Sequence, residues 1–133
     1  MKIVCIAGGT MGHLNPAISV LQHIKQHQSQ DTCYLITDER CAKFIQKSTQ
    51  EDNIPKAYIL DVKSPMILKQ AIKQRKFLLI LLNLFTLSIN YALCFFKMLQ
   101  YFWNIRPDIA IGFGSYVSFI PIITAKMFGC KIL

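Results

Sequence analysis

The stretch that decides the fold is KIVCIAGGTMGHLNP, residues 2–16. Its first six residues predict a strand at 2–7. Glycines follow at 8, 9 and 12, and glycine lets the backbone turn with positive φ and approach a ligand closely. We expect a helix to begin at Asn15, with Asn15 as its N-cap and Pro16 as its first residue. A strand, a glycine loop and a helix N-terminus in this order are typical of a phosphate-binding cradle.

This first loop leaves two alternatives open. Thr10 occupies the position of the second glycine in the dinucleotide fingerprint G-x-G-x-x-G, so a nicotinamide-dependent oxidoreductase is the weaker interpretation. The other alternative is a loop that turns the chain and binds nothing. His13 adds a side chain that titrates near neutral pH at the mouth of the loop.

Composition bounds the class of protein. With 133 residues the chain is long enough for one domain with a buried core. A hydrophobic content of 53% argues against disorder, and a net charge of +8 favours an anionic partner. We do not expect that partner to be a nucleic acid. Five widely spaced cysteines without a C-x-x-C pair indicate reduced, cytosolic thiols, and the N-terminus reads as a strand rather than a secretory signal. The excess charge lies between Val62 and Pro107, where no acidic residue accompanies Lys63, Lys69, Lys73, Arg75, Lys76, Lys97 and Arg106.

The rest of the chain alternates strands with helices, which predicts a Rossmann-like, doubly wound parallel sheet. Asp38 and Glu39 follow the second strand. An acid there can bind a ribose in dinucleotide enzymes, but we favour a cap for the helix that begins at Arg40. The expected strands lie at 32–37, 56–61, 108–112 and from 131, and the expected helices at 40–47 and 117–128.

A second glycine loop lies at 112–116, after another apolar strand. Ser115 or Ser118 could cap the helix that follows, and Pro121 is tolerable in its first turn. Because parallel strands bind ligands at their carboxyl ends, the two glycine loops are expected to converge on one site. A tight turn without a ligand remains the alternative for this loop taken alone.

The segment 77–96 contains twenty residues without a charge, flanked by Lys73, Arg75, Lys76 and Lys97. Its length permits a membrane span. Its polar residues nevertheless share one side of a helical wheel, with Ser88 opposite, and the apolar arc exceeds what a surface helix needs for its own core. We therefore favour a helix that docks on the domain and presents apolar surface to an anionic membrane, over a span and over an ordinary buried helix or partner interface. The polar side consists of Lys76, Asn83, Thr86, Asn90, Lys97, Gln100 and Asn104.

These motifs together resemble one family. GGTMGH at 8–13 followed by NPA at 15–17, RPD at 106–108 and GFGSYVS at 112–118 are similar to the amino-terminal half of the MurG family. The resemblance covers essentially the whole chain. It implies the first, acceptor- and membrane-side domain of a GT-B glycosyltransferase, with the donor-binding domain absent from a chain truncated at its C-terminal end.

The resemblance also implies residue roles. Thr10, Met11 and Gly12 match the family's donor-contacting Thr-Gly-Gly run, and His13 matches its loop histidine. Two residues depart from the pattern, because Met11 and Ser115 each replace a glycine. If either position needs a positive φ, the replacement costs about 1 kcal/mol or more, and Met11 could crowd a ligand. The acceptor pyrophosphate is expected at Gly112, Gly114, Ser115 and Tyr116.

Members of this family transfer N-acetylglucosamine from UDP-N-acetylglucosamine to undecaprenyl-pyrophosphoryl-muramoyl-pentapeptide in peptidoglycan synthesis. For this chain the resemblance implies a peripheral location at the cytoplasmic face of the inner membrane. His13 is expected to act as base or as an orienting hydrogen-bond partner, without a metal or cofactor. We expect the 133 residues alone to be inactive. The rival hypothesis is a non-catalytic docking subunit that recruits a separate donor-binding chain.

Overall fold

The computed structural model describes residues 1–27, 30–47, 57–62, 72–73 and 77–133. Five strands in this part of the chain form one sheet in the order β3-β2-β1-β4-β5, and every neighbouring pair is parallel. This arrangement confirms the predicted doubly wound α/β fold. The strands are β1 (Lys2–Ile6), β2 (Thr32–Thr37), β3 (Ala57–Ile59), β4 (Ile109–Gly112) and β5 (Lys131–Ile132).

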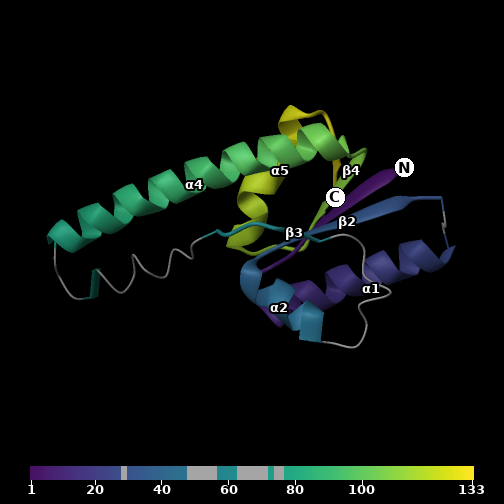
Figure 1. The fold of residues 1–133 in the computed structure, drawn as a ribbon, viewed down its shortest axis with the longest axis horizontal. Coiled ribbons are helices and arrows are strands. Elements are labelled where there is room, and N and C mark those ends of the chain that lie inside the picture. Colours follow the sequence, from purple (N-terminus) through teal and green to yellow (C-terminus); the bar gives the residue numbers. More distant parts are fainter. Residues whose placement is uncertain (28–29, 48–56, 63–71, 74–76) are drawn as a thin grey trace.

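Helices cover both faces of the sheet (Figure 1). Because successive strand residues point to opposite faces, β1 contributes Val4 and Ile6 to one core cluster and Cys5 to the other. The Val4 cluster lies against α4 and α5, and the Cys5 cluster lies against α1 and α2. The helical elements are α1 (Met11–His27), α2 (Glu39–Lys47), α4 (Phe77–Ile105), the short 3-10 turn η2 (Tyr116–Ser118) and α5 (Phe119–Met127).

The direction of strand succession reverses at β1, which lies between β2 and β4. At such a switch point the connections leave the carboxyl edge of the sheet toward opposite faces, and a crevice opens between them. The segments after β1, β2, β3 and β4 all reach this edge. The topology alone therefore places both glycine loops at one position.

Helix α1 begins at Met11, so the prediction of a start at Asn15 is wrong. The Thr10 carbonyl accepts hydrogen bonds from the N–H groups of His13 (3.2 Å) and Leu14 (3.3 Å), and Pro16 lies inside the helix. Proline loses one helical hydrogen bond there. The longer helix nevertheless adds the fully buried Leu14 to its core-facing side, and such burial is worth about 1.5–3 kcal/mol. The loop proper is reduced to residues 8–10.

The connection after β4 also differs from expectation. The chain makes the turn η2 before α5, and neither Ser115 nor Ser118 forms a capping side-chain bond, so that prediction is wrong. The Ser118 hydroxyl instead binds back to the carbonyls of Gly114 and Ile6, the latter at 3.4 Å. Pro121 does lie in the first turn of α5, as predicted.

Helix α4 contacts the sheet through its second half only. Its buried residues are Cys94, Met98, Phe102 and Ile105, spaced for one helical stripe. Where α4 reaches the domain, the Asp61 carbonyl accepts hydrogen bonds from Asn90 Nδ2 (3.1 Å) and from the Cys94 thiol.

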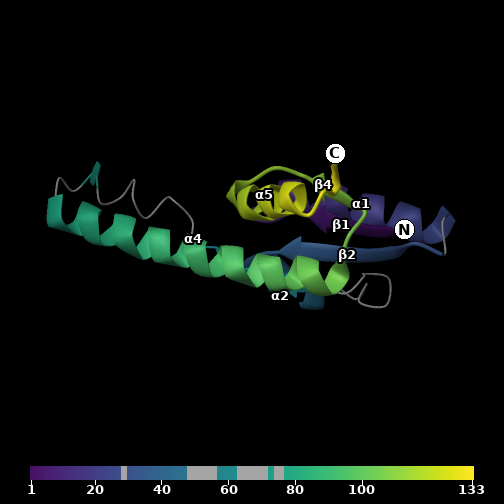
Figure 2. The same cartoon turned by 90° about the horizontal axis from the view of Figure 1, so that it is seen from above.

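The first half of α4 extends past the strands in both views, and none of residues 77–89 is buried (Figures 1 and 2). Of the seven basic residues between Val62 and Pro107, Lys63, Lys69, Arg75 and Lys76 lie outside the described residues.

Candidate functional site

The two glycine loops touch each other at the carboxyl edge of the sheet. A Cβ atom built on Gly9 would lie 2.5 Å from the Ser115 hydroxyl oxygen and 3.2 Å from Cε1 of Tyr116. A Cβ on Gly114 would lie 3.4 Å from Cε1 of His13. The predicted convergence of the loops is therefore confirmed. Gly9 and Gly114 both have positive φ, 80° and 84°, so both positions use the conformational freedom of glycine.

A pocket of about 750 Å³ opens where the loops meet. Four of the predicted site residues line it: Thr10, His13, Ser115 and Tyr116. Gly114 leaves room for the His13 ring, since a Cβ built on it would lie 3.5 Å from Nδ1 of that ring. The remaining lining residues come from the ends of β1, β2 and β3, and they are Gly9, Asp38, Glu39, Arg40, Asp61 and Val62.

Three predicted site residues lie away from this lining. Met11 packs against the Cys5 core cluster, and Gly12 sits exposed in the first turn of α1. Gly112 permits close packing of α5, because a Cβ there would lie 2.7 Å from Cδ1 of Ile122. Their roles toward a ligand stay predictions.

Asp38 joins the first loop to helix α2. One carboxylate oxygen accepts the backbone N–H of Cys41 (3.1 Å), which confirms the predicted cap, and the other accepts the N–H of Gly9 (3.2 Å). Burial favours the neutral acid, but hydrogen bonds from Cys41 and Gly9 and the charge of Arg40 outweigh it and lower the pKa of Asp38. Asp38 is therefore an anion that stabilises the backbone geometry of the loop.

Arg40 crosses from the end of β2 to the second loop. Its Nη2 donates a hydrogen bond to the Tyr116 hydroxyl (2.9 Å) and lies 3.5 Å from an Asp38 carboxylate oxygen. The Tyr116 and Asp38 interactions raise the pKa of Arg40, which stays fully charged. The backbone of Arg40 is held in α2 because the next two residues, Cys41 and Ala42, are buried. The Arg40 side chain itself is 69% exposed.

Sequence analysis missed Arg40 and Asp61 as pocket residues. The signal was present, because both follow strands of the predicted parallel sheet and the carboxyl ends of such strands share an edge. What the sequence did not reveal is the reach of the Arg40 side chain across the end of β1.

The two departures from the family pattern have different structural consequences. Ser115 has φ 79° and ψ 157°, a region that is almost restricted to glycine, so its backbone is strained by about 1–3 kcal/mol. Met11 is the first residue of α1 and its φ is not positive. Its side chain packs against the core and does not crowd the pocket.

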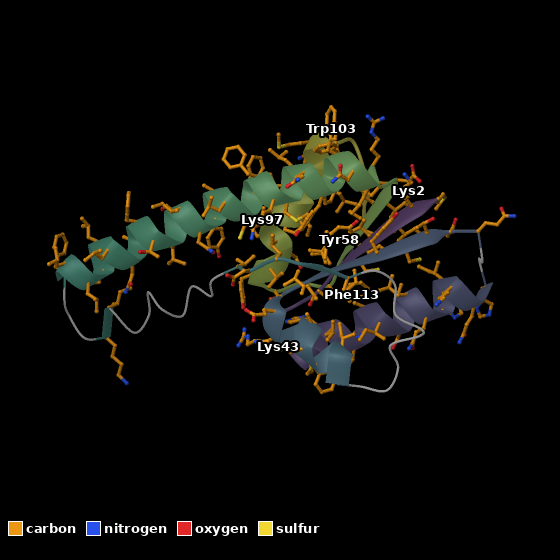
Figure 3. All side chains as sticks on the ribbon, in the orientation of Figure 1. Lys2, Lys43, Tyr58, Lys97, Trp103 and Phe113 are labelled. Atoms are coloured by element: carbon orange, nitrogen blue, oxygen red, sulfur yellow. The ribbon has the colours of Figure 1, made fainter. Side chains whose placement is uncertain are left out.

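A second surface feature adjoins the site. The outer face of α4 carries large exposed apolar side chains, including Leu78 (74% exposed), Phe85 (67%) and Trp103 (66%). Figure 3 shows Trp103 on the side of α4 away from the sheet and Tyr58 on the sheet side. By length and composition α4 could cross a membrane, with a mean hydropathy of 2.0 in its most apolar window. We define the outer face as Leu78, Leu81, Leu82, Phe85, Ile89, Leu93, Phe96 and Trp103.

Comparisons with known proteins point to one family. Residues 3–133 match the model of the glycosyltransferase family 28 N-terminal domain. Over 132 residues the chain is 30% identical to the UDP-N-acetylglucosamine--N-acetylmuramyl-(pentapeptide) pyrophosphoryl-undecaprenol N-acetylglucosamine transferase of Rickettsia bellii. The match covers 99% of this chain and 30% of that enzyme, so the chain spans about a third of its relative.

Solved structures support the same fold. Acinetobacter baumannii MurG superposes with a TM-score of 0.70 at 15% identity, covering 98% of this chain and 34% of that one. The glycosyltransferase VinC, solved with DTDP, gives a TM-score of 0.60 at 10% identity, covering 99% and 33%. The architecture is thus that of the Rossmann-like N-terminal domain of a GT-B glycosyltransferase. On its match over residues 3–133, the chain belongs to the glycosyltransferase family 28 N-terminal domain family.

Proposed function

We propose that this chain is the acceptor- and membrane-side domain of a transferase that moves N-acetylglucosamine from UDP-N-acetylglucosamine to undecaprenyl-pyrophosphoryl-muramoyl-pentapeptide. A donor-binding domain outside these 133 residues completes the enzyme. The observation that carries the proposal is the pocket at the switch point, which both glycine loops line beside His13. The family match favours this function over a docking subunit without catalytic activity and over an oxidoreductase.

The pocket can supply two needs of an inverting sugar transfer. A base must take the proton of the acceptor hydroxyl, and donors must stabilise the charge of a diphosphate. His13 lies in the first turn of α1, its ring beside Gly114, and we assign it the role of base or orienting residue. Thr10 lies at the same helix end, where backbone N–H groups and the helix dipole favour an anion.

The second loop is proposed to hold the acceptor diphosphate. Ser115 and Tyr116 line the pocket directly, although the Tyr116 hydroxyl is already engaged by Arg40, while Gly112 and Gly114 shape the backbone that presents them. Met11 and Gly12 remain proposed donor-side residues, reached through the exposed first turn of α1. Since the stabilising groups are backbone N–H groups and side chains, the proposed mechanism uses no metal or cofactor.

The outer face of α4 is proposed to rest on the anionic cytoplasmic surface of the inner membrane. From Asn90 onward the helix is docked on the domain, because Asn90 binds the Asp61 carbonyl and Tyr91 packs against the core, which leaves residues 77–89 before this docked part. A span needs about 20 residues, so a peripheral position fits better. Exposed Lys97 and Arg106 add attraction to anionic lipids, about 1 kcal/mol each near the surface.

A transfer assay tests the catalytic proposal. The purified chain is given labelled UDP-N-acetylglucosamine and the lipid-linked acceptor, alone and with a separately produced donor-binding domain from a relative. We expect turnover only in the mixture, and a loss of at least 100-fold with His13→Ala. Multiple turnovers by the chain alone would contradict the proposed division between two domains. Full activity of His13→Ala in the mixture would remove His13 from the mechanism.

Vesicle binding tests the membrane proposal separately. Phe85→Gln and Thr86→Gln change neighbouring exposed residues of α4 without changing charge, but only Phe85 belongs to the outer face. We expect Phe85→Gln to weaken binding to anionic vesicles about 10- to 100-fold, the cost of about 1.5–3 kcal/mol of lost apolar burial. Thr86→Gln should bind as the parent does, and equal losses in the two variants would contradict the assignment of this face.

A further inference from the structure

The interaction between Arg40 and Tyr116 joins two residues that line the pocket, and Arg40 belongs to neither loop motif. The Arg40 guanidinium starts at the end of β2, and Tyr116 starts after β4, so their hydrogen bond of 2.9 Å passes across the end of β1. The Tyr116 ring also lies beside Gly9, whose built Cβ would approach it to 3.2 Å.

The charges that line the pocket single out one binding position for an anion. Asp38 accepts hydrogen bonds from Gly9 and Cys41, and Glu39 pairs with Lys43 at 2.7 Å. Asp61 follows β3, at the other end of the lining from Ser115. Among the described lining residues Arg40 is the only lysine or arginine. An anionic ligand is therefore attracted to the Arg40 guanidinium and repelled from Asp61 at the β3 end.

We propose that Arg40 is a diphosphate-binding residue and that Tyr116 positions its guanidinium before the diphosphate binds. This inference rests on the proposed function and adds a binding residue to it. A guanidinium presents paired N–H donors that match phosphate oxygens, whereas the Tyr116 hydroxyl engages one of them only. The ligand replaces the neutral hydroxyl as acceptor, and Asp38 keeps the guanidinium at the pocket while this exchange occurs.

We expect substitutions of Arg40 and of Tyr116 to have opposite effects on diphosphate affinity. Removing the Arg40 charge removes a charge-assisted pair with the diphosphate, which weakens binding about 10- to 100-fold. Removing the Tyr116 hydroxyl removes the acceptor that the diphosphate must displace, so binding tightens about 2- to 10-fold. A purely structural hydrogen bond between the two residues would instead make both variants bind more weakly.

Calorimetric titration of the full 133-residue chain tests the proposal with three probes: inorganic pyrophosphate, UDP and farnesyl diphosphate. The variants are Arg40→Gln, Arg40→Lys and Tyr116→Phe. Lys126→Gln is the matched control, because Lys126 lies exposed in the last turn of α5, carries the same charge and stands outside the pocket lining. UDP and farnesyl diphosphate distinguish a nucleotide source from a prenyl source of the diphosphate.

The proposal is supported if Arg40→Gln lowers the affinity, Arg40→Lys restores part of it, Tyr116→Phe raises it and Lys126→Gln leaves it unchanged. The proposal is overturned if Arg40→Gln and Lys126→Gln bind alike, if Tyr116→Phe loses affinity, or if the parent chain binds none of the probes. If diphosphate binding depends on Arg40 but the mixed assay shows no sugar transfer, the proposed function is wrong and the role of Arg40 stands. If sugar transfer occurs but diphosphate binding does not depend on Arg40, the proposed function stands and the role of Arg40 is wrong.

Discussion

A methyl group on Gly9 would stand 2.5 Å from the Ser115 hydroxyl oxygen, closer than real Cβ atoms approach. Gly12, in the same motif, has only Thr10 Oγ1 near its built Cβ, at 3.7 Å, and lies in the first turn of α1. The two glycines should therefore respond to alanine with opposite signs. Gly9→Ala should lower the free energy of unfolding by about 1–3 kcal/mol, through the clash and the positive φ.

Gly12→Ala should raise the free energy of unfolding by about 0.5–1 kcal/mol, because alanine is the better helix former. Urea denaturation of both variants measures the difference. Equal destabilisation of the two would show that residue 12 belongs to the loop and not to the helix.

The pair Ser115 and Met11 offers a second comparison of this kind. Ser115→Gly should stabilise the chain by about 1 kcal/mol, because strain at φ 79° is relieved while some entropy is returned to the unfolded chain. Met11→Gly should destabilise it by about 1 kcal/mol or more, through lost helix propensity and lost packing. Thermal unfolding of the two variants tests the signs, and stabilisation by Met11→Gly would contradict the helical assignment of that residue.

Asp38 should give stability a pH dependence. Its folded-state pKa is lowered, so its contribution is fully present above the unfolded value of about 3.9 and is lost as pH falls through the folded pKa. The difference in unfolding free energy between the parent and Asp38→Asn should be constant from about pH 7 to 5 and shrink below about pH 4. Denaturation at several pH values measures it.

Glu39→Gln is the control for this pH series, because Glu39 is exposed and pairs only with Lys43 at the surface. Such a pair is worth about 0.3–0.5 kcal/mol. A difference between the parent and Asp38→Asn that does not change with pH would mean that the Asp38 charge plays no part in holding Gly9 and Cys41.

Two phenylalanines of α4 test how the helix docks. Phe102 is fully buried and Phe96 is 65% exposed. Phe102→Ala should cost about 3–5 kcal/mol of unfolding free energy, whereas Phe96→Ala should cost less than about 0.5 kcal/mol. Chemical denaturation distinguishes them, and similar losses for both would indicate that the outer face of α4 is covered in solution.

The elements with strong local patterns could be predicted from the sequence. The strand at 32–37 is observed with the same bounds, and the first strand and the helix after Asp38 differ by about a residue at one end. The meeting of the glycine loops also followed, because parallel connectivity forces the carboxyl ends of β1 and β4 to one edge. These features depend on local periodicity and on chain topology, which a single sequence contains.

The features that could not be predicted depend on tertiary contacts. The start of α1 was misplaced because the burial of Leu14 outweighs the preference of Pro16 for a first helical position. The hydrogen bond between Arg40 and Tyr116 joins residues 76 positions apart. The Ser118 hydroxyl does not cap a helix because it hydrogen-bonds the distant Ile6 carbonyl. A local pattern carries no information about such partners.

Helix α4 leaves the sheet at the carboxyl edge, because Asn90 and Cys94 bind the Asp61 carbonyl there while Ile105 ends at the opposite edge, beside Lys2 and Asp108. Residues 77–89 therefore form a rod of about 20 Å on the side where the pocket opens. Such a rod sets how far the apolar outer face of α4 reaches beyond the pocket along any surface on which that face rests. Inserting or deleting one helical turn in this half would change that reach by about 5 Å without altering a single residue of the pocket.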